Sequence, residues 1–224
     1  MSVDSIPANA AVLVIGLGRF GTAAAGELIR LDRDVLVIDT DPQLVQTWSE
    51  VVTHAVQADA RNIDALRQIG AQDFSIAVVA VGSSIEASVL ITANLVDLGV
   101  PQIWAKAISK SHGTILERIG ANHVIFPELE AGERAAHLVS GRMLDFIEFD
   151  DDFVMVKMHP PKPIRGVALS ESGVRRKFRI TVVGVKTPGQ EFTYATAETV
   201  VSDHDLIIVS GNSADIEKFA NLEK

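Results

Sequence analysis

Short runs of apolar residues alternate with amphipathic segments from Ala11 to about Leu144. The apolar runs are rich in Val and Ile and carry few charges, as is typical of strands buried on both faces of a sheet. We predict six strands, at Ala11–Ile15, Val35–Ile38, His54–Val56, Ile76–Val81, Gln102–Ala107 and His123–Phe126. The segments between them are predicted helices, at Phe20–Leu31, Pro42–Ser49, Ile63–Ile69, Ile85–Leu98 and Thr114–Ile119. This alternation predicts an α/β fold, a Rossmann-like doubly wound parallel sheet.

The pattern changes after Leu144, where a charged break at Asp150–Asp152 is followed by several prolines. Short predicted strands and one helix then follow, at Val154–Met158, Ile180–Lys186, Leu206–Val209 and Asp215–Leu222. We therefore predict two domains, a nucleotide-binding domain of residues 1–145 and a small α+β domain of residues 146–224. A helix at Glu130–Leu144 is the predicted connector, with an ordinary last Rossmann helix as the alternative.

Composition narrows the function classes. Hydrophobic residues make up 47% and charged residues 22% of the chain, which is a globular balance. Cysteine is absent, which excludes disulfides, Cys-ligated metal sites and a thiol nucleophile. The net charge of −9 argues against a nucleic acid partner. The start of the chain lacks a signal-peptide pattern, and apolar runs such as Ile76–Val81 fall far short of the roughly 20 residues that span a bilayer, so we expect a soluble, cytoplasmic protein.

A glycine-rich turn follows the first predicted strand and opens an Ala-rich helix. It has G-x-G-x-x-G spacing and consists of Gly16, Leu17, Gly18, Arg19, Phe20 and Gly21. The first glycine permits a tight turn, the second lets a phosphate approach the backbone, and the third lets the helix pack on the strand. Free N–H groups at the helix start favour an anion. The alternatives are a degenerate turn that binds nothing and, for Arg19, a solvated side chain.

An acidic residue, Asp39, ends the second predicted strand about 20 residues beyond the glycines. A carboxylate there accepts hydrogen bonds from ribose hydroxyls and disfavours a 2′-phosphate, so NADP is not expected. Asp39 suits the ribose of ATP, ADP or NAD(H) equally. We include the next two residues, Thr40 and Asp41, in the predicted nucleotide site.

Other strand ends meet at the same edge of the predicted sheet, where ligands of such folds bind. They carry Asp59 and Ala60 after the third strand, Val81, Gly82 and Ser83 at the fourth, and Lys106 at the fifth. Asp59 can accept a hydrogen bond from an adenine amino group or, alternatively, cap the helix Ile63–Ile69. Gly82 permits close approach of a ligand or merely forms a loop.

The residues that catalysis would require are missing. The chain has six histidines, none of them in a motif with a paired acid, and no G-x-x-x-x-G-K-[ST], H-E-x-x-H or G-x-S-x-G motif. We therefore predict a nucleotide sensor rather than an enzyme. The alternatives are a small NAD-dependent oxidoreductase and a nucleotide-sensing regulator unrelated to transport, such as a repressor.

Five segments together resemble a known family. They are Gly16–Leu28, Val35–Pro42, Thr53–Leu66, Ala77–Ser88 and Ile103–Gly132. They closely resemble the RCK (regulator of K⁺ conductance) domain, and the chain is similar to the cytosolic regulatory subunits of Ktr/Trk potassium uptake systems, the KtrA/TrkA family. The resemblance covers nearly the whole chain, although the C-terminal part matches in length and pattern more than in motif.

The resemblance implies binding of ATP or ADP, and in some members NAD or NADH, by the Rossmann unit. It also implies a homodimer that assembles into an octameric ring and docks on an integral-membrane potassium-translocating subunit of the KtrB/TrkH type. The protein would then lie at the inner face of the cell membrane through that partner. Exchange of the nucleotide would change the shape of the ring.

The resemblance also implies roles for particular residues. The glycine loop, Gly16 to Gly21, holds the phosphates, with Arg19 at the terminal phosphate and Lys106 beside it. Asp39 holds the ribose, and Asp59 and Ala60 lie near the adenine. Glu128 matches an acid near the dimer interface that helps to place Mg²⁺ or a monovalent cation. Cyclic di-AMP would lie near Ile164, Arg176 and Ile180, for which core packing and a solvated arginine are the alternatives.

Overall fold

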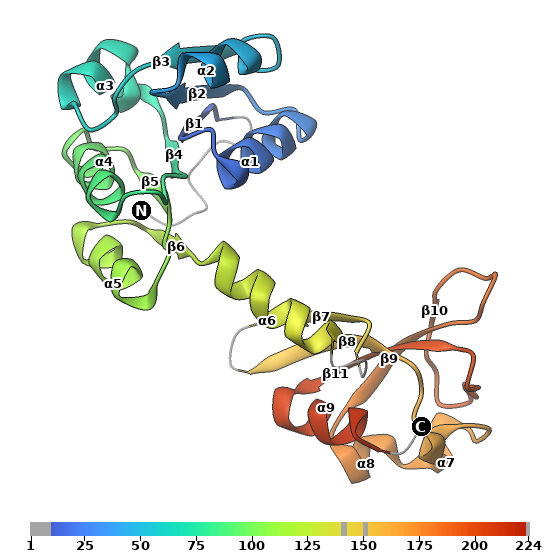
Figure 1. Ribbon diagram of the computed structural model, residues 1–224. Coiled ribbons are helices and arrows are strands. Elements are labelled where there is room, and N and C mark those ends of the chain that lie inside the picture. Colours follow the sequence, from blue (N-terminus) through green and yellow to red (C-terminus); the bar gives the residue numbers. More distant parts are fainter. Residues whose placement is uncertain (1–9, 140–142, 150–151, 223–224) are drawn as a thin grey trace. The chain divides into compact units, whose positions relative to one another are not determined.

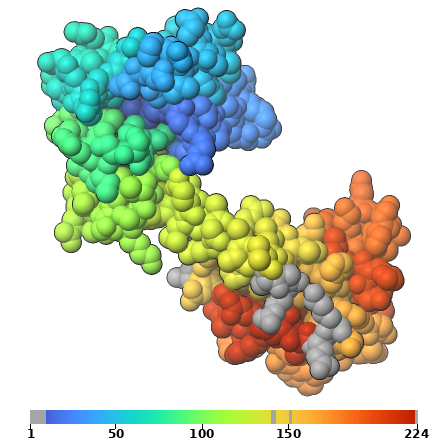
Figure 2. All heavy atoms as spheres, in the orientation of Figure 1, coloured from blue at the N-terminus to red at the C-terminus, as the bar shows by residue number. Residues whose placement is uncertain are grey.

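The computed structural model describes residues 10–139, 143–149 and 152–222. The chain forms two compact units that divide between Leu129 and Glu130. The division lies inside helix α6 (Pro127–Val139), which begins three residues before the predicted connector. In the space-filling view the first unit is coloured from blue to green and the second from yellow to red (Figure 2).

The first unit is built on a six-stranded parallel sheet with the order β3-β2-β1-β4-β5-β6. The strands are β1 (Val12–Ile15), β2 (Val35–Asp39), β3 (His54–Gln57), β4 (Ile76–Val79), β5 (Gln102–Lys106) and β6 (His123–Ile125) (Figure 1). The order reverses at β1, so that β2 and β4 pair with it on opposite sides. The Rossmann-like fold predicted from the sequence is confirmed.

Both faces of this sheet are covered, which explains why its central strands read as continuous apolar runs. Val12 and Val14 point to one core, and Leu13 and Ile15 to the other. The first core includes side chains of α1 (Arg19–Arg30) and α2 (Pro42–Trp48). The second includes side chains of α3 (Ile63–Ile69), α4 (Ile85–Asp97) and α5 (Lys110–Ile119).

Helix α5 begins at Lys110, so the predicted start at Thr114 is wrong. The side chain of Ser109 accepts a hydrogen bond from the backbone N–H of His112 and so caps the helix, at 3.2 Å. His112 is polar but is turned inward and only 1% exposed. Because a polar residue stands at this buried position, the hydrophobic pattern did not indicate the first helical turn.

The second unit is a five-stranded antiparallel sheet with the order β10-β9-β11-β8-β7. The strands are β7 (Asp145–Glu148), β8 (Phe153–Met158), β9 (Thr181–Lys186), β10 (Thr193–Tyr194) and β11 (Leu206–Asn212). The helices are α7 (Leu169–Ser172), α8 (Val174–Phe178) and α9 (Ser213–Ala220). One core joins the sheet to α9 through Ile216 and Phe219. The α+β class predicted for this part is confirmed.

The predicted connector helix extends too far in its last residues. Leu144 is not helical, since its N–H donates to the carbonyl of Lys157 in β8 at 2.7 Å. Residues 140–142 of the predicted helix, and residues 150–151 of the predicted charged break, lie outside the described residues. Among the described helices, none has both the length and the apolar character needed to cross a membrane.

Candidate functional site

The glycine turn between β1 and α1 has the geometry that its spacing predicts. Gly16 has a φ of +100°, where a side chain would be strained, and its N–H donates to the carbonyl of Ile38 at 2.8 Å. A Cβ on Gly21 would lie 1.8 Å from the carbonyl oxygen of Gly16. A Cβ on Gly18 would meet nothing within 4 Å, and Gly18 is the N-cap of α1 with no side-chain cap. The turn therefore leaves space in front of free helix N–H groups, as an anion site requires.

Asp39 ties this turn to the end of β2. One carboxylate oxygen accepts from the N–H of Leu17 at 2.6 Å, and the other accepts from the N–H of Asp41 at 2.9 Å. The sequence predicted a ribose-binding acid, and it did not predict these two backbone bonds. A carboxylate has about four acceptor positions, so about two remain for ribose hydroxyls. Asp41 itself caps α2 by accepting from the N–H groups of Gln43 and Leu44.

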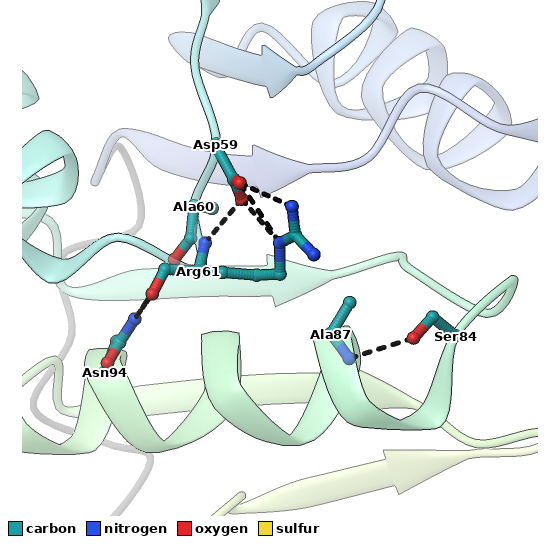
Figure 3. Close-up of polar contacts among 6 residues, drawn as sticks. All are labelled: Asp59, Ala60, Arg61, Ser84, Ala87 and Asn94. Atoms are coloured by element: carbon teal, nitrogen blue, oxygen red, sulfur yellow. Dashed lines mark hydrogen bonds and ion pairs between the residues drawn. The ribbon is translucent and has the colours of Figure 1, made fainter.

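A hollow of about 170 Å³ opens beside the turn, at the carboxyl ends of β1, β2 and β3. Several predicted residues line it, namely Gly16, Asp39, Thr40, Asp59, Ala60, Val81 and Ser83. The first turns of α4 complete its wall through Ala87 and Ile91. Ser84 caps α4, since its Oγ accepts from the N–H of Ala87 at 3.1 Å (Figure 3). The hollow combines apolar walls with two carboxylates, which suits a base and a ribose.

Asp59 does not cap α3, so that alternative is wrong. Asn62 is the N-cap and accepts from the N–H of Asp64 at 2.9 Å. The carboxylate of Asp59 instead holds the guanidinium of Arg61, with Nη2 to Oδ2 at 2.6 Å (Figure 3). These hydrogen bonds from Arg61 lower the pKa of the Asp59 carboxyl. Arg61 also lines the hollow but was not among the predicted residues; its position two residues after a strand-end acid was the available signal.

Another predicted residue, Lys106, lies close to Glu128, Phe20 and Gly82. The ammonium of Lys106 lies 2.6 Å from a carboxylate oxygen of Glu128 and 6.0 Å from the centre of the Phe20 ring. A Cβ on Gly82 would come within 3.3 Å of the same ammonium. The hydrogen bond from Lys106 lowers the pKa of Glu128, and the positive charge of Arg19 adds to this. Arg19, Lys106 and Glu128 therefore share one electrostatic environment.

Glu128 lies outside any group of three or more potential metal ligands in the part of the chain that the structure describes. The described residues contain no group of three or more His, Cys, Asp or Glu side chains that could hold a metal ion. One oxygen of the Glu128 carboxylate also accepts a hydrogen bond from Lys106. A cation there would need further ligands, such as phosphate oxygens or groups of a second chain.

Of the three residues suggested for cyclic di-AMP, two belong to one buried core and the third lines a hollow. Ile164 and Ile180 are buried in the core of the second unit, at 0% and 1% exposure. Arg176 lines a separate hollow of about 490 Å³, together with Arg175, Glu171 and Thr196.

Comparison with known proteins identifies the family. Residues 12–127 match the TrkA-N domain and residues 153–224 match the TrkA-C domain. The chain is 32% identical over 214 residues to the Ktr system potassium uptake protein A of Bacillus subtilis (strain 168), an alignment covering 95% of this chain and 96% of that protein. The chain belongs to the RCK-domain family of Ktr and Trk potassium uptake proteins. It is also 33% identical over 207 residues to the Ktr system potassium uptake protein C of the same organism, covering 92% and 94%.

Solved structures of other proteins share the fold. The GsuK RCK domain matches with a TM-score of 0.66 at 16% identity, covering 98% of this chain and 50% of that one. The GsuK channel bound to NAD matches with a TM-score of 0.64 at 16% identity, covering 98% and 41%. The present chain therefore spans about half the length of these GsuK chains or less. The resemblance seen in the sequence is confirmed, since these Ktr relatives are potassium uptake proteins.

Proposed function

We propose that this protein is a non-catalytic regulatory subunit that senses an adenine nucleotide and controls a membrane potassium transporter. One observation carries the proposal: in a chain of the Ktr family, an open glycine turn with free helix N–H groups adjoins a hollow lined by Asp39 and Asp59. This arrangement fits a ligand whose purine base and ribose lie in the hollow and whose phosphates lie at the glycine turn.

The ligand is ATP or ADP, with NAD or NADH as the alternative that shares the same adenosine half. The hollow would take the adenosine, and the glycine turn would take the phosphates. The solved GsuK channel bound to NAD shares the fold, and ligands of such folds bind at the carboxyl edge of the parallel sheet. Arg19 and Lys106 would meet the outer phosphates, and Mg²⁺ or a monovalent cation would be held between those phosphates and Glu128.

The working assembly is a homodimer that builds an octameric ring on an integral-membrane subunit of the KtrB/TrkH type, at the inner face of the membrane. Helix α6 supports a contact with a second copy, because none of its residues is buried in the single chain. Its exposed apolar residues include Leu129, Leu138 and Val139. Cyclic di-AMP would bind in the C-terminal unit.

Control requires that the nucleotides bind two shapes of the ring with different affinities. ATP and ADP differ by one phosphate, so the groups around the terminal phosphate must supply the difference. Arg19 is exposed in the first turn of α1 and carries a positive charge next to the Lys106–Glu128 pair. Recognition of the last phosphate by Arg19 would convert a change of charge into a change of shape.

Arg19→Ala is expected to weaken ATP binding more than ADP binding. A differential of about 1–3 kcal/mol, or roughly 5–150-fold, is typical of such coupling. Calorimetric titration of the native protein and of Arg19→Ala with ATP and with ADP measures this difference. Arg30→Ala at the other end of α1 is the matched control, since Arg30 pairs with Glu27 away from the turn. An equal loss of affinity for ATP and ADP would contradict a terminal-phosphate sensor.

A thermal-shift panel of ATP, ADP, NAD⁺, NADH and cyclic di-AMP tests the function itself, because a ligand that binds the folded state raises Tm. We expect ATP or ADP to raise Tm and the protein to run as an octamer in size-exclusion chromatography with light scattering. A monomer whose Tm responds to none of these compounds would refute the proposal. Turnover of a substrate with NAD⁺ would favour the oxidoreductase instead.

A further inference from the structure

Neighbouring strands of the sheet supply different parts of the nucleotide site. The glycine turn follows β1, Asp39 ends β2, and Asp59 follows β3 at the edge of the sheet. A nucleotide with its phosphates on the turn and its ribose at Asp39 therefore has its base at the loop between β3 and α3. The charged side chains that line the hollow from this loop are Asp59 and Arg61.

Arg61 occupies most of the hydrogen-bonding capacity of Asp59. The Oδ1 atom accepts from the backbone N–H of Arg61 at 3.0 Å and from its Nε at 2.9 Å. The Oδ2 atom accepts from Nη2 at 2.6 Å and shares Nε at 3.1 Å. A carboxylate has about four acceptor positions, so this arrangement leaves about one, on Oδ2.

Hydrogen bonds from helix α4 hold this loop in place. The side-chain amide of Asn94 in α4 donates to the carbonyls of Ala60 and Arg61, at 3.2 and 2.9 Å (Figure 3). The negative charge of Glu86, in the first turn of α4, adds to the attraction on the guanidinium. The Asp59–Arg61 pair is thus fixed through both its side chains and its backbone.

Adenine and guanine differ in what they require from a carboxylate. Guanine presents two adjacent donors, N1–H and N2–H, which pair with both oxygens of a free carboxylate. Adenine presents a single amino group, N6–H₂, next to an acceptor. We propose that Arg61 sets the base selectivity of this site: by occupying Asp59 it leaves one acceptor for the adenine amino group and denies guanine a two-point contact. The proposal rests on the proposed nucleotide function and assigns Arg61 as a positioning residue for Asp59.

Calorimetric titration of the full chain with ADP and GDP tests this assignment. We expect the native protein to prefer ADP, and Arg61→Ala to reduce the ratio of the two affinities by about tenfold, mainly because GDP binds better. Arg61→Lys keeps the charge but loses the planar fork, so it is expected to relax selectivity as well. Arg67→Ala is the control, because Arg67 is about as exposed as Arg61 (56% against 54%) and pairs with Asp64 on α3.

The possible failures are distinguishable. If the native protein binds ADP and Arg61→Ala does not change the ratio of ADP to GDP affinity, the role of Arg61 is overturned and the nucleotide function stands. A native preference for GDP would have the same consequence. Binding of neither nucleotide by the native protein would overturn both. Because the Arg61 side chain is 54% exposed, the variant is expected to fold, and an unchanged Tm without ligand confirms that the ratio reports recognition.

Discussion

Gly21→Ala is expected to lower the free energy of unfolding by about 3 kcal/mol or more, and to abolish nucleotide binding. The added Cβ would lie 1.8 Å from the carbonyl oxygen of Gly16 and 3.0 Å from the Cβ of Ala80. Gly16 lies in the turn after β1 and Ala80 is buried just after β4, so α1 would have to move away from these strand ends. Urea unfolding followed by circular dichroism measures the loss.

The same helix provides a matched control for Gly21. A Cβ on Gly26 would meet only the ring of Trp48, at 3.9 Å, which is ordinary contact. Gly26→Ala is therefore expected to leave stability unchanged or to raise it by up to about 1 kcal/mol through helix propensity. Equal stability of the two variants would show that α1 does not pack on the turn as described here.

Asp39→Ala is expected to reduce the affinity for ATP and ADP by about 100-fold. The substitution removes the acceptor for the ribose hydroxyls and also releases the N–H groups of Leu17 and Asp41. Hydrogen bonds to a charged group are worth about 1.5–3 kcal/mol each, and about 2.7 kcal/mol corresponds to 100-fold. Calorimetric titration measures the change.

Two further variants separate the roles of Asp39. Asp39→Asn keeps one acceptor oxygen, so it is expected to bind with intermediate affinity. Asp64→Ala removes an exposed acid from the first turn of α3, away from the turn between β1 and α1, and is expected to bind normally. Full ATP affinity in Asp39→Ala would place the ribose elsewhere.

The fold of the first unit was predictable because its signals are local. Strands buried on both faces read as apolar runs, and the glycine spacing marks the one turn that this topology needs. The start of α5 was not predictable in the same way. The inward position of His112 depends on the tertiary core rather than on its own polarity.

The position of a site residue was predictable where the fold of the backbone determines it. It was not predictable where it depends on contacts between side chains. Gly16, Asp39 and Asp59 follow strand ends, so they reach the hollow by topology alone. The fork of Arg61 on Asp59, and the pairing of Lys106 with Glu128 across 22 residues, arise from the folded arrangement. The strands β7 and β10 were not predicted; they are the edge strands of the second sheet and pair with β8 and β9.

Calorimetric titration of the purified full chain with ATP and ADP tests the central claim most directly. The account predicts one adenine nucleotide per chain for the native protein and for Asp64→Ala, and a loss of about 100-fold in affinity for Asp39→Ala. A native chain that takes up no adenine nucleotide, or one that binds it equally well without the Asp39 carboxylate, would contradict the account.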